Sequence, residues 1–247
     1  MSVLPQLPRN SLSALRKQLV YRRQRIAMKT STSALELRHQ ANYLELARHT
    51  DWLDNPPVSS PGGTASYSLL YVLLSLLRSG DFTHILEFGV GQSSKLISAY
   101  VTGTPGATSM HVEHDKEWLD RAVPCSPGIQ RVHAPLIKTK VFDKEVQWYS
   151  MERPESQFDL LLVDGPPALS RGMRFNRHGI LNWIPEVLAD DFVLIFDDAA
   201  RIGERKATAA VKRILSETGR EILSADFTGG SSQTVFATPK YRYAVYL

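Results

Sequence analysis

Short apolar runs alternate with amphipathic segments along most of the chain after residue 63. Residues 64–80 place Leu70, Leu73, Leu74 and Leu77 at helical spacing, which predicts a helix that ends at Gly80. Strand-like runs follow at 83–89, 108–115, 129–137, 158–167, 191–200, 220–227 and 231–239, and helical segments lie among them at 92–101, 116–123, 177–189 and 204–217. This alternation predicts an α/β fold with a mostly parallel sheet and helices on both faces.

The last two runs are joined by residues 228–232, "TGGSS", which are too few to hold a crossover helix. Parallel neighbours need such a crossover, whereas antiparallel neighbours need only a turn. We therefore expect the sheet to close with an antiparallel pair.

A different pattern precedes residue 64. Leu12, Leu15, Leu19 and Ile26 keep helical spacing. Ser33, with Glu36 three residues later, has the pattern of a capping box that begins a second helix. The Pro-, Gly- and Ser-rich residues 54–63 are typical of a linker. We expect a helical extension over residues 1–63 and one main domain over residues 64–247.

Composition narrows the class of protein. The chain has 247 residues, 43% of them hydrophobic, and no apolar run approaches the roughly 20 residues that cross a bilayer. Its opening residues lack the pattern of a signal peptide, so we expect a cytoplasmic protein. The single Cys125 excludes an intrachain disulfide and a cysteine-based metal site.

The net charge of +4 is unevenly distributed, because residues 1–50 hold nine Lys or Arg against two Glu. A basic segment of this kind can contact nucleic acid, anionic lipid or an acidic partner. Aromatic residues do not alternate with the arginines as a base-stacking surface requires. A solvated helical face is therefore the favoured interpretation, and a nucleic-acid partner remains the alternative.

The clearest candidate for chemistry is the turn in "ILEFGVGQSS", where a buried strand meets a helix. Gly89 and Gly91 allow a tight bend and close approach of a ligand to the backbone, and the helix that follows directs N–H groups toward the same place. Glu113 ends the next strand, 22 residues after Gly91, where a carboxylate can bind ribose hydroxyls. Ser94 stands where a dinucleotide-binding motif has its third glycine. Glu87 would repel a pyrophosphate but suits a cationic ligand.

These features resemble the class I S-adenosylmethionine-dependent methyltransferases, from about Ser66 to Pro239. "LEFGVGQS" is similar to the first motif of that family and "FDLLLVDGPP" to the fourth. The resemblance implies a doubly wound, Rossmann-like, seven-stranded sheet whose last strand is antiparallel. It also implies that S-adenosylmethionine is bound by Glu87, Gly89, Gly91, Gln92, Ser93, Glu113, His133 and Asp164, with Ser66 and Tyr67 close enough to reach this ligand or the acceptor.

More narrowly, "EFGVGQSSKL", "HVEHDKEWL", "LLVDGPP" and "FDDAAR" resemble methyltransferases of bacterial polysaccharide and sugar-modification pathways. This resemblance implies O-methylation of a sugar-containing or other small hydroxylated acceptor. It covers the main domain and not the basic extension.

Carboxylates follow the fourth and fifth strands of the main domain, at Asp164 and at Asp197 and Asp198. Three such groups at one sheet edge repel one another unless a cation or a proton lies among them. Hard oxygen ligands suit Mg²⁺ or another divalent cation, and the pattern is similar to that of catechol-type O-methyltransferases, which have Asp-Asn where this chain has Asp-Asp. We expect Asp164 and Asp197 to be catalytic. The alternative is that Asp198 caps the next helix and Asp164 only orients substrate.

Residues 168–179 follow the fourth strand and carry Arg171, Arg174, Arg177 and His178. Arginines bind carboxylates and phosphates through paired hydrogen bonds, so this segment predicts an anionic acceptor. His178 titrates in the range of a general base. The alternative is an exposed loop whose arginines meet acidic side chains or solvent.

Three other functions remain open on the sequence. A nucleotide-linked oxidoreductase would use the same glycine turn for NAD(P). An RNA methyltransferase would use the basic extension, and a non-catalytic scaffold would keep the fold and bind no adenosyl ligand.

Overall fold

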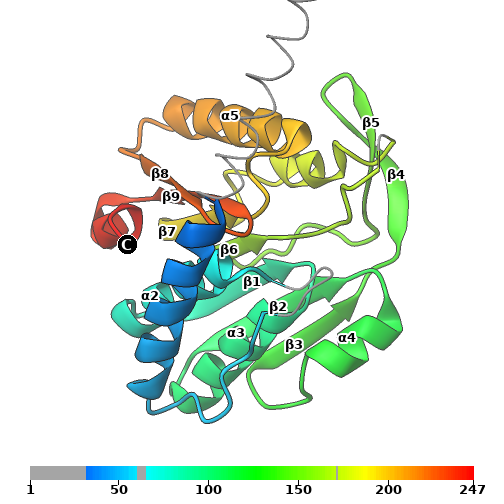
Figure 1. The fold of residues 1–247 in the computed structure, drawn as a ribbon. Coiled ribbons are helices and arrows are strands. Elements are labelled where there is room, and N and C mark those ends of the chain that lie inside the picture. The colour runs from blue at the N-terminus through cyan, green and yellow to red at the C-terminus, as the bar shows by residue number, and fades with distance from the viewer. Residues whose placement is uncertain (1–31, 60–64, 171) are drawn as a thin grey trace, which may run out of the picture.

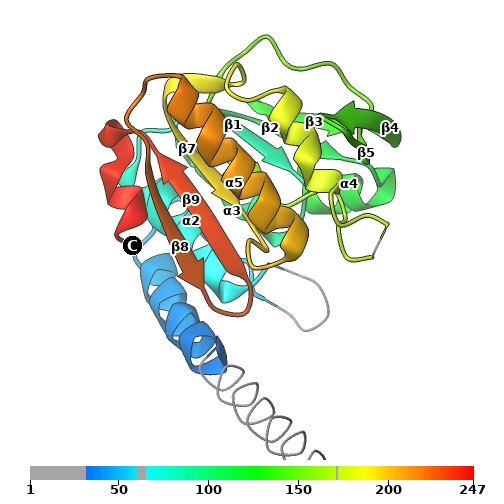
Figure 2. The same ribbon diagram turned by 90° about the horizontal axis from the view of Figure 1, so that it is seen from above.

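The computed structural model describes residues 32–59, 65–170 and 172–247. The predicted helix around Leu12 to Ile26 and the candidate Arg171 therefore lie outside the described residues. Within the described part, a seven-stranded sheet forms the centre of the molecule, with helices packed on its two faces (Figures 1 and 2). No helix in this part combines the length and apolar character needed to span a bilayer.

The sheet has the strand order β3-β2-β1-β6-β7-β9-β8. Its strands are β1 (His84–Phe88), β2 (Thr108–Glu113), β3 (Ile129–His133), β6 (Phe158–Val163), β7 (Leu188–Phe196), β8 (Leu223–Thr228) and β9 (Ser232–Ala237). The first five of these are parallel, whereas β9 runs antiparallel to both β7 and β8. This is the doubly wound, Rossmann-like sheet with a closing antiparallel strand that the sequence predicts.

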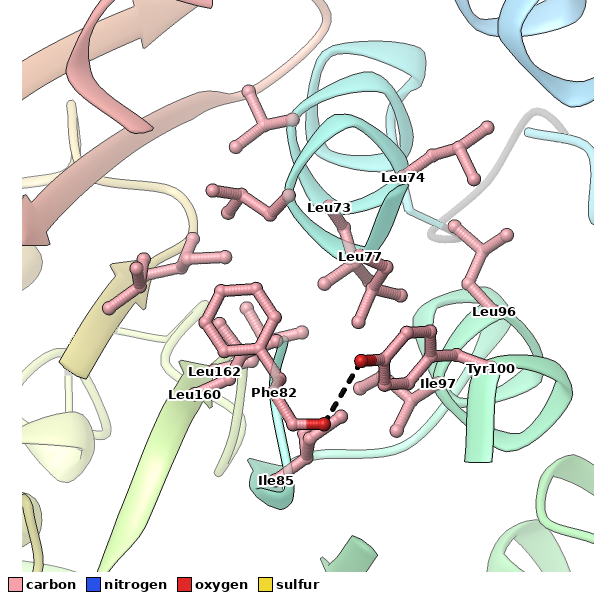
Figure 3. Close-up of a cluster of buried hydrophobic side chains, with 14 of the residues drawn as sticks. Leu73, Leu74, Leu77, Phe82, Ile85, Leu96, Ile97, Tyr100, Leu160 and Leu162 are labelled. Atoms are coloured by element: carbon pink, nitrogen blue, oxygen red, sulfur yellow. Dashed lines mark hydrogen bonds between the residues drawn. The ribbon is translucent and has the colours of Figure 1, made fainter. Parts of the chain in front are cut away.

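One face is covered by α2 (Tyr67–Ser79) and α3 (Gln92–Gly103), with the short 3₁₀ segment η2 (Pro239–Val245) at its margin. Leu73, Leu74 and Leu77 belong there to the same buried core cluster as Phe82 and Ile85 (Figure 3). The hydroxyl of Tyr100 donates to the carbonyl of Phe82 across this core. Gly80 ends α2 as predicted.

The opposite face is covered by α5 (Ile202–Glu217), the 3₁₀ segment η1 (Asn176–Asn182) and a hairpin of β4 (Leu136–Val141) and β5 (Lys144–Tyr149). A smaller helix, α4 (Lys116–Ala122), connects β2 to β3 and packs beside Val90. The hairpin forms a separate two-stranded sheet and was not predicted (Figure 1).

Two predicted elements differ from the structure. The run predicted as one strand over 129–137 is divided between β3 and β4, because Pro135 has no N–H to continue the ladder. The helix predicted over 177–189 is only the 3₁₀ segment η1, followed by turns. Pro185 disfavours helix at the residue before it. A Cβ on Gly179 would lie 2.0 Å from the Trp148 ring of β5, so glycine allows the segment to pack closely on the hairpin.

The helix with the expected capping box is present over residues 32–48, but it does not begin at Ser33. Residue 32 is already helical, so Ser33 is not the N-cap. Tyr43 and Ala47 of this N-terminal helix, and Leu53 after it, are buried in the same core cluster as α2. The described part of the extension thus packs on the main domain, and the division at residues 63 and 64 remains a prediction.

Candidate active site

A cavity of about 310 Å³ opens at the carboxyl ends of β1 and β6. We call it the glycine-turn cavity, and it is lined by Ala65, Val90, Gly91, Gln92, Ser93, Lys95, Trp118, Arg121, Ala122 and Asp164. The strand order reverses between β1 and β6, which is where open α/β sheets bind their ligands. The structure therefore brings the predicted turn, the start of α3 and Asp164 together at one cavity.

The two glycines of the turn have different roles. Gly89 has a φ of +81°, and a Cβ there would lie 2.7 Å from the backbone nitrogen of Gly165. Gly89 is therefore needed for the bend itself. A Cβ on Gly91 would meet no atom within 4 Å, and Gly91 lines the cavity, so its missing side chain leaves room for a ligand.

Glu87 lies beneath this turn and is fully buried. Its carboxylate accepts hydrogen bonds from the hydroxyls of Ser93 (2.5 Å) and Ser94 (2.6 Å) and contacts Nδ1 of His111 at 2.6 Å. His111 is also fully buried, and its Nε2 lies 2.9 Å from the hydroxyl of Ser109. Both Glu87 oxygens are thus engaged by the protein, and Glu87 supports the start of α3 without lining the cavity.

Glu113 is buried at the end of β2 and faces the same turn. Its Oε2 accepts from the backbone N–H of Val90 at 3.2 Å, and its Oε1 accepts from those of His114 and Asp115. Trp118 of α4 donates from Nε1 to the carbonyl of Val90 at 2.6 Å and forms one side of the cavity. The residues of "HVEHDKEWL" therefore hold the turn from the β2 side.

Three of the other predicted ligand contacts do not line the cavity. His133 is exposed, and its Nε2 lies 3.1 Å from the carbonyl of His114. Ser66 is the N-cap of α2, and Tyr67 packs against Tyr43, with ring centroids 5.8 Å apart. Their neighbour Ala65 lines the cavity instead.

The three predicted carboxylates do come together. Ligand oxygens of Asp164, Asp197 and Asp198 lie within 4.8 Å of one another, and we call this group the carboxylate cluster. Asp198 has a φ of +58°, in the left-handed region that aspartate adopts more readily than most residues. The cluster adjoins the cavity through Asp164, whose side chain is 25% exposed.

Arg177 supplies the cation of this cluster. Its guanidinium is only 5% exposed and donates to the carbonyls of Asp164 (2.6 Å) and Asp197 (2.9 Å). It also contacts Asp164 Oδ1 at 3.1 Å and Asp198 Oδ2 at 3.2 Å. Because these bonds engage the guanidinium with the strand ends, Arg177 is not an exposed contact for an anionic substrate, in contrast to the prediction.

Burial raises the pKa of Asp164 well above its ordinary value, and the nearby charge of Asp197 adds to the effect. Burial likewise raises the pKa of Asp198, again assisted by Asp197. Burial lowers the pKa of Arg177, but the charges of Asp164, Asp198 and Asp197 outweigh this effect and raise it overall. The guanidinium groups of Arg177 and Arg201 therefore do not offset the burial and mutual repulsion of these acids.

His178 and Arg174 lie outside the cluster. His178 is buried, and its Nε2 donates to the carbonyl of Gly203 at 3.1 Å, while burial lowers its pKa. It does not line the glycine-turn cavity, so the structure gives no support to a general-base role there. Arg174 lines a separate, shallow pocket together with Arg201 and Glu204 of the α5 start.

Sequence reasoning missed several residues of the site. Ser94 and His111 complete the partners of Glu87, and Ser231 and Gln233 of the β8–β9 hairpin bind Asp197 Oδ1 at 2.8 Å and 2.6 Å. Tyr149 is fully buried, and no described residue hydrogen-bonds its hydroxyl. The spacing of these residues along the chain gave no signal, because the contacts join segments far apart in sequence.

No family model matches this chain, and no curated protein matches it. Among solved structures, an O-methyltransferase from Bacillus cereus in complex with SAH is similar, with 12% identity and a TM-score of 0.48, over 85% of this chain and 99% of that one. The O-methyltransferase TomG from Streptomyces achromogenes, in complex with SAM, is similar with 14% identity and a TM-score of 0.46, over 85% and 97% of the two chains. The SAH-bound methyltransferase PaMTH1 from Podospora anserina shares 14% identity with a TM-score of 0.41, over 96% and 99%. These likenesses are too distant to transfer a function, so the function must be argued from this chain's own residues.

Proposed function

We propose that this protein is an S-adenosylmethionine-dependent methyltransferase that O-methylates a small hydroxylated acceptor. The observation that carries the proposal is the glycine-turn cavity, because it lies at the switch point between β1 and β6 and has one carboxylate, Asp164, on its wall. The closing antiparallel strand β9 supports the same class, since the resemblance of the sequence implied it. The acidic group that faces the cavity is Asp164, whereas Glu87 lies underneath.

The residues present fit this methyl donor. Gly91 leaves open space beside the backbone, Gln92 and Ser93 place the first turn of α3 on the cavity, and Trp118 offers an indole wall. A partly exposed carboxylate suits the ammonium and sulfonium groups of the ligand better than a diphosphate. When bound, S-adenosylmethionine supplies a methyl group on a sulfonium that already has a good leaving group.

This chain's remaining tasks are to orient the acceptor and to accept its proton. Asp164 is our candidate for the proton acceptor, because it faces the cavity and burial raises its pKa above its ordinary value. Arg177 orients Asp164 through its side chain and its carbonyl. Asp197, held by Ser231 and Gln233, fixes the far side of the cluster.

We further propose that the carboxylate cluster holds a divalent cation. Protein donors use Oδ1 of Asp164, Oδ1 of Asp197 and Oδ2 of Asp198, so each carboxylate is anchored through one oxygen. Anchoring of this kind orients metal ligands, and three carboxylates form an all-oxygen donor set that suits Mg²⁺. The cation would balance the carboxylate charge that Arg177 does not neutralise, and it would lower the pKa of an acceptor hydroxyl.

The acceptor is proposed to be sugar-containing, as the sequence resemblance implies, and anionic, as the arginines of residues 168–179 predict. Arg174 supports an anionic group, because it lines a shallow pocket, whereas Arg201 of the same pocket already contacts Asp198 of the cluster at 2.7 Å. Arg177 no longer supports it, since its guanidinium is engaged by the carboxylate cluster.

Calorimetry with S-adenosylmethionine and with NAD separates the proposal from its main rival. We expect the adenosyl ligand to bind and NAD not to bind, and we expect Glu113→Ala to weaken the binding because it frees the turn at Val90. Binding of NAD alone would favour an oxidoreductase, and binding of neither would favour a scaffold.

A titration with Mn²⁺ tests the cation, and equal Mn²⁺ affinity of the wild type and of Asp197→Asn would exclude the cluster as its site.

A further inference from the structure

Glu36 of the N-terminal helix reaches two segments that are far from it in sequence. Its carboxylate accepts hydrogen bonds from the backbone N–H groups of Tyr67 (2.6 Å) and Ser68 (3.2 Å) at the start of α2. It also accepts from the N–H of Gly230 (2.5 Å) in the turn between β8 and β9. Figure 1 shows the N-terminal helix running beside that turn. One side chain thus joins three parts of the fold.

At α2, Glu36 completes the cap of the helix. The first N–H groups of a helix have no intrahelical partner. Ser66 satisfies that of Leu69 at 3.2 Å, and Glu36 satisfies those of Tyr67 and Ser68. A negative charge at this end is also favourable to the helix dipole. Glu36 therefore fixes the position at which α2 begins, two residues after Ala65.

At the β8–β9 turn, the contact depends on glycine. A Cβ on Gly230 would lie 2.7 Å from Cδ of Glu36, and a Cβ on Gly229 would lie 2.6 Å from Cβ of Ser68. The next residue, Ser231, has its hydroxyl 2.6 Å from that of Ser66. The turn is therefore pressed against the start of α2, and Glu36 bridges the two.

Both bridged segments belong to the candidate site. Ala65, immediately before the α2 cap, lines the glycine-turn cavity. Ser231 donates to Oδ1 of Asp197 in the carboxylate cluster at 2.8 Å. Hydrogen bonds thus run from Ser66 through Ser231 to Asp197, and Glu36 binds the backbone of residues adjacent to both serines, Tyr67 and Gly230.

We propose that Glu36 is a positioning residue of the active site, which holds the wall at Ala65 and the support of Asp197 in their binding geometry. The inference rests on the proposed function, because the ligand expected in the cavity is the adenosyl group of the methyl donor. It gives the extension a role in the site, although sequence reasoning separated the extension from the main domain. A cavity whose walls are already ordered binds a ligand more tightly, because less conformational entropy is lost on binding.

The test compares Glu36→Ala, Glu36→Gln and Glu45→Gln with the wild type. Glu45 lies on the same helix but is exposed, and its ion pairs among the described residues are with Arg48 and His49, so its variant is a matched control. The affinity for S-adenosylhomocysteine is measured by calorimetry, well below each variant's unfolding temperature. We expect Glu36→Ala to bind about tenfold more weakly, and Glu36→Gln about threefold, because Gln keeps one acceptor oxygen but loses the charge. Glu45→Gln should bind as the wild type does.

Hydrogen exchange in the ligand-free protein gives a second readout. Amides over residues 65–70 and 229–233 should exchange faster in Glu36→Gln than in Glu45→Gln. Unchanged ligand affinity in both Glu36 variants would overturn the inference even if their unfolding temperatures fell, since a purely structural role predicts that result. Absence of S-adenosylhomocysteine binding by the wild type would instead overturn the proposed function, and the exchange rates would still show whether Glu36 fixes the two segments.

Discussion

Glu87 and Asp164 lie at the ends of the adjacent strands β1 and β6, yet their carboxylates have opposite surroundings. Glu87 is fully buried, with two serine hydroxyls and the imidazole of His111 around it. Asp164 is 25% exposed on the cavity wall and shares one guanidinium with Asp198. The Glu87 carboxylate is therefore enclosed by hydrogen-bonding partners, whereas the Asp164 carboxylate has too little positive charge nearby to balance its own.

This difference indicates a structural role for Glu87 and a chemical role for Asp164. A buried carboxylate whose oxygens are all hydrogen-bonded fixes the groups around it and has little left to offer a ligand. An acid that is partly exposed and has a raised pKa is available to a proton or a cation. Acidic residues at two neighbouring strand ends therefore differ in role: one supports the turn and the other is available to a ligand.

The largest effect is expected for Arg177→Met. This change removes the buried cation among three carboxylates, and losing one partner of a buried ion pair costs about 3–5 kcal/mol. Arg201→Met is the control, because Arg201 is 36% exposed and contacts only Asp198 of the cluster. Its loss should cost at most about 1 kcal/mol. Urea denaturation measures both, and equal losses would show that Arg177 is not the cation on which the cluster depends.

The glycine turn between the two acids offers a second contrast. Gly89→Ala should lower the free energy of unfolding by about 1–3 kcal/mol from its positive φ alone, before the contact with Gly165 is added. Gly91→Ala should leave stability nearly unchanged but weaken adenosyl binding, because the new methyl group enters the cavity. Chemical denaturation and calorimetry separate the two effects. Equal stability of the two variants would contradict the assigned roles.

The raised pKa of Asp164 predicts a specific pH dependence. The folded protein binds this proton more tightly than the unfolded chain does, so the stability that Asp164 contributes is full below its unfolded-state pKa. It is lost as the pH rises through the higher folded-state pKa. The free energy of unfolding of the wild type minus that of Asp164→Asn should therefore fall from acidic to neutral pH. A difference that rises with pH would mean that the ion pair with Arg177 dominates and lowers the pKa of Asp164.

The smallest effect is expected for Tyr149→Phe. The Tyr149 hydroxyl is buried without a partner among the described residues, so its removal should change stability by less than about 1 kcal/mol or increase it. Tyr43→Phe is the control, since that hydroxyl donates to the carbonyl of Pro57 at 2.7 Å, a bond worth about 1 kcal/mol. Thermal unfolding of both variants checks this pair. A larger loss in Tyr149→Phe would reveal a hydrogen bond to its hydroxyl.

Most of the sheet could be predicted because its signals are local. Apolar runs such as that of β6 are buried on both faces, and the three-residue connection between β8 and β9 excludes a crossover. The β4–β5 hairpin and η1 were not predicted, because their form depends on contacts with each other. Gly179 packs on Trp148, and the side chain of Asn176 accepts from the N–H of Gln147 at 3.0 Å.

The sequence predicted where the residues of the candidate site lie in the fold better than it predicted which groups they contact. The strand-end rule placed Asp164, Asp197 and Asp198 together, as the structure does. The sequence pattern predicts Glu36 as a cap of its own helix and Arg177 as a contact for substrate. Their actual partners lie in distant segments, and a carboxylate or guanidinium in sequence carries no sign of which backbone groups it will meet.

A crystal structure with S-adenosylhomocysteine tests the central claim most directly. We expect the adenosyl ligand in the glycine-turn cavity, beside Gly91 and Trp118, with its sulfur toward Asp164 and with Glu87 still bound to Ser93, Ser94 and His111. Density for the ligand elsewhere, or a Glu87 carboxylate released from those partners to contact it, would contradict the account.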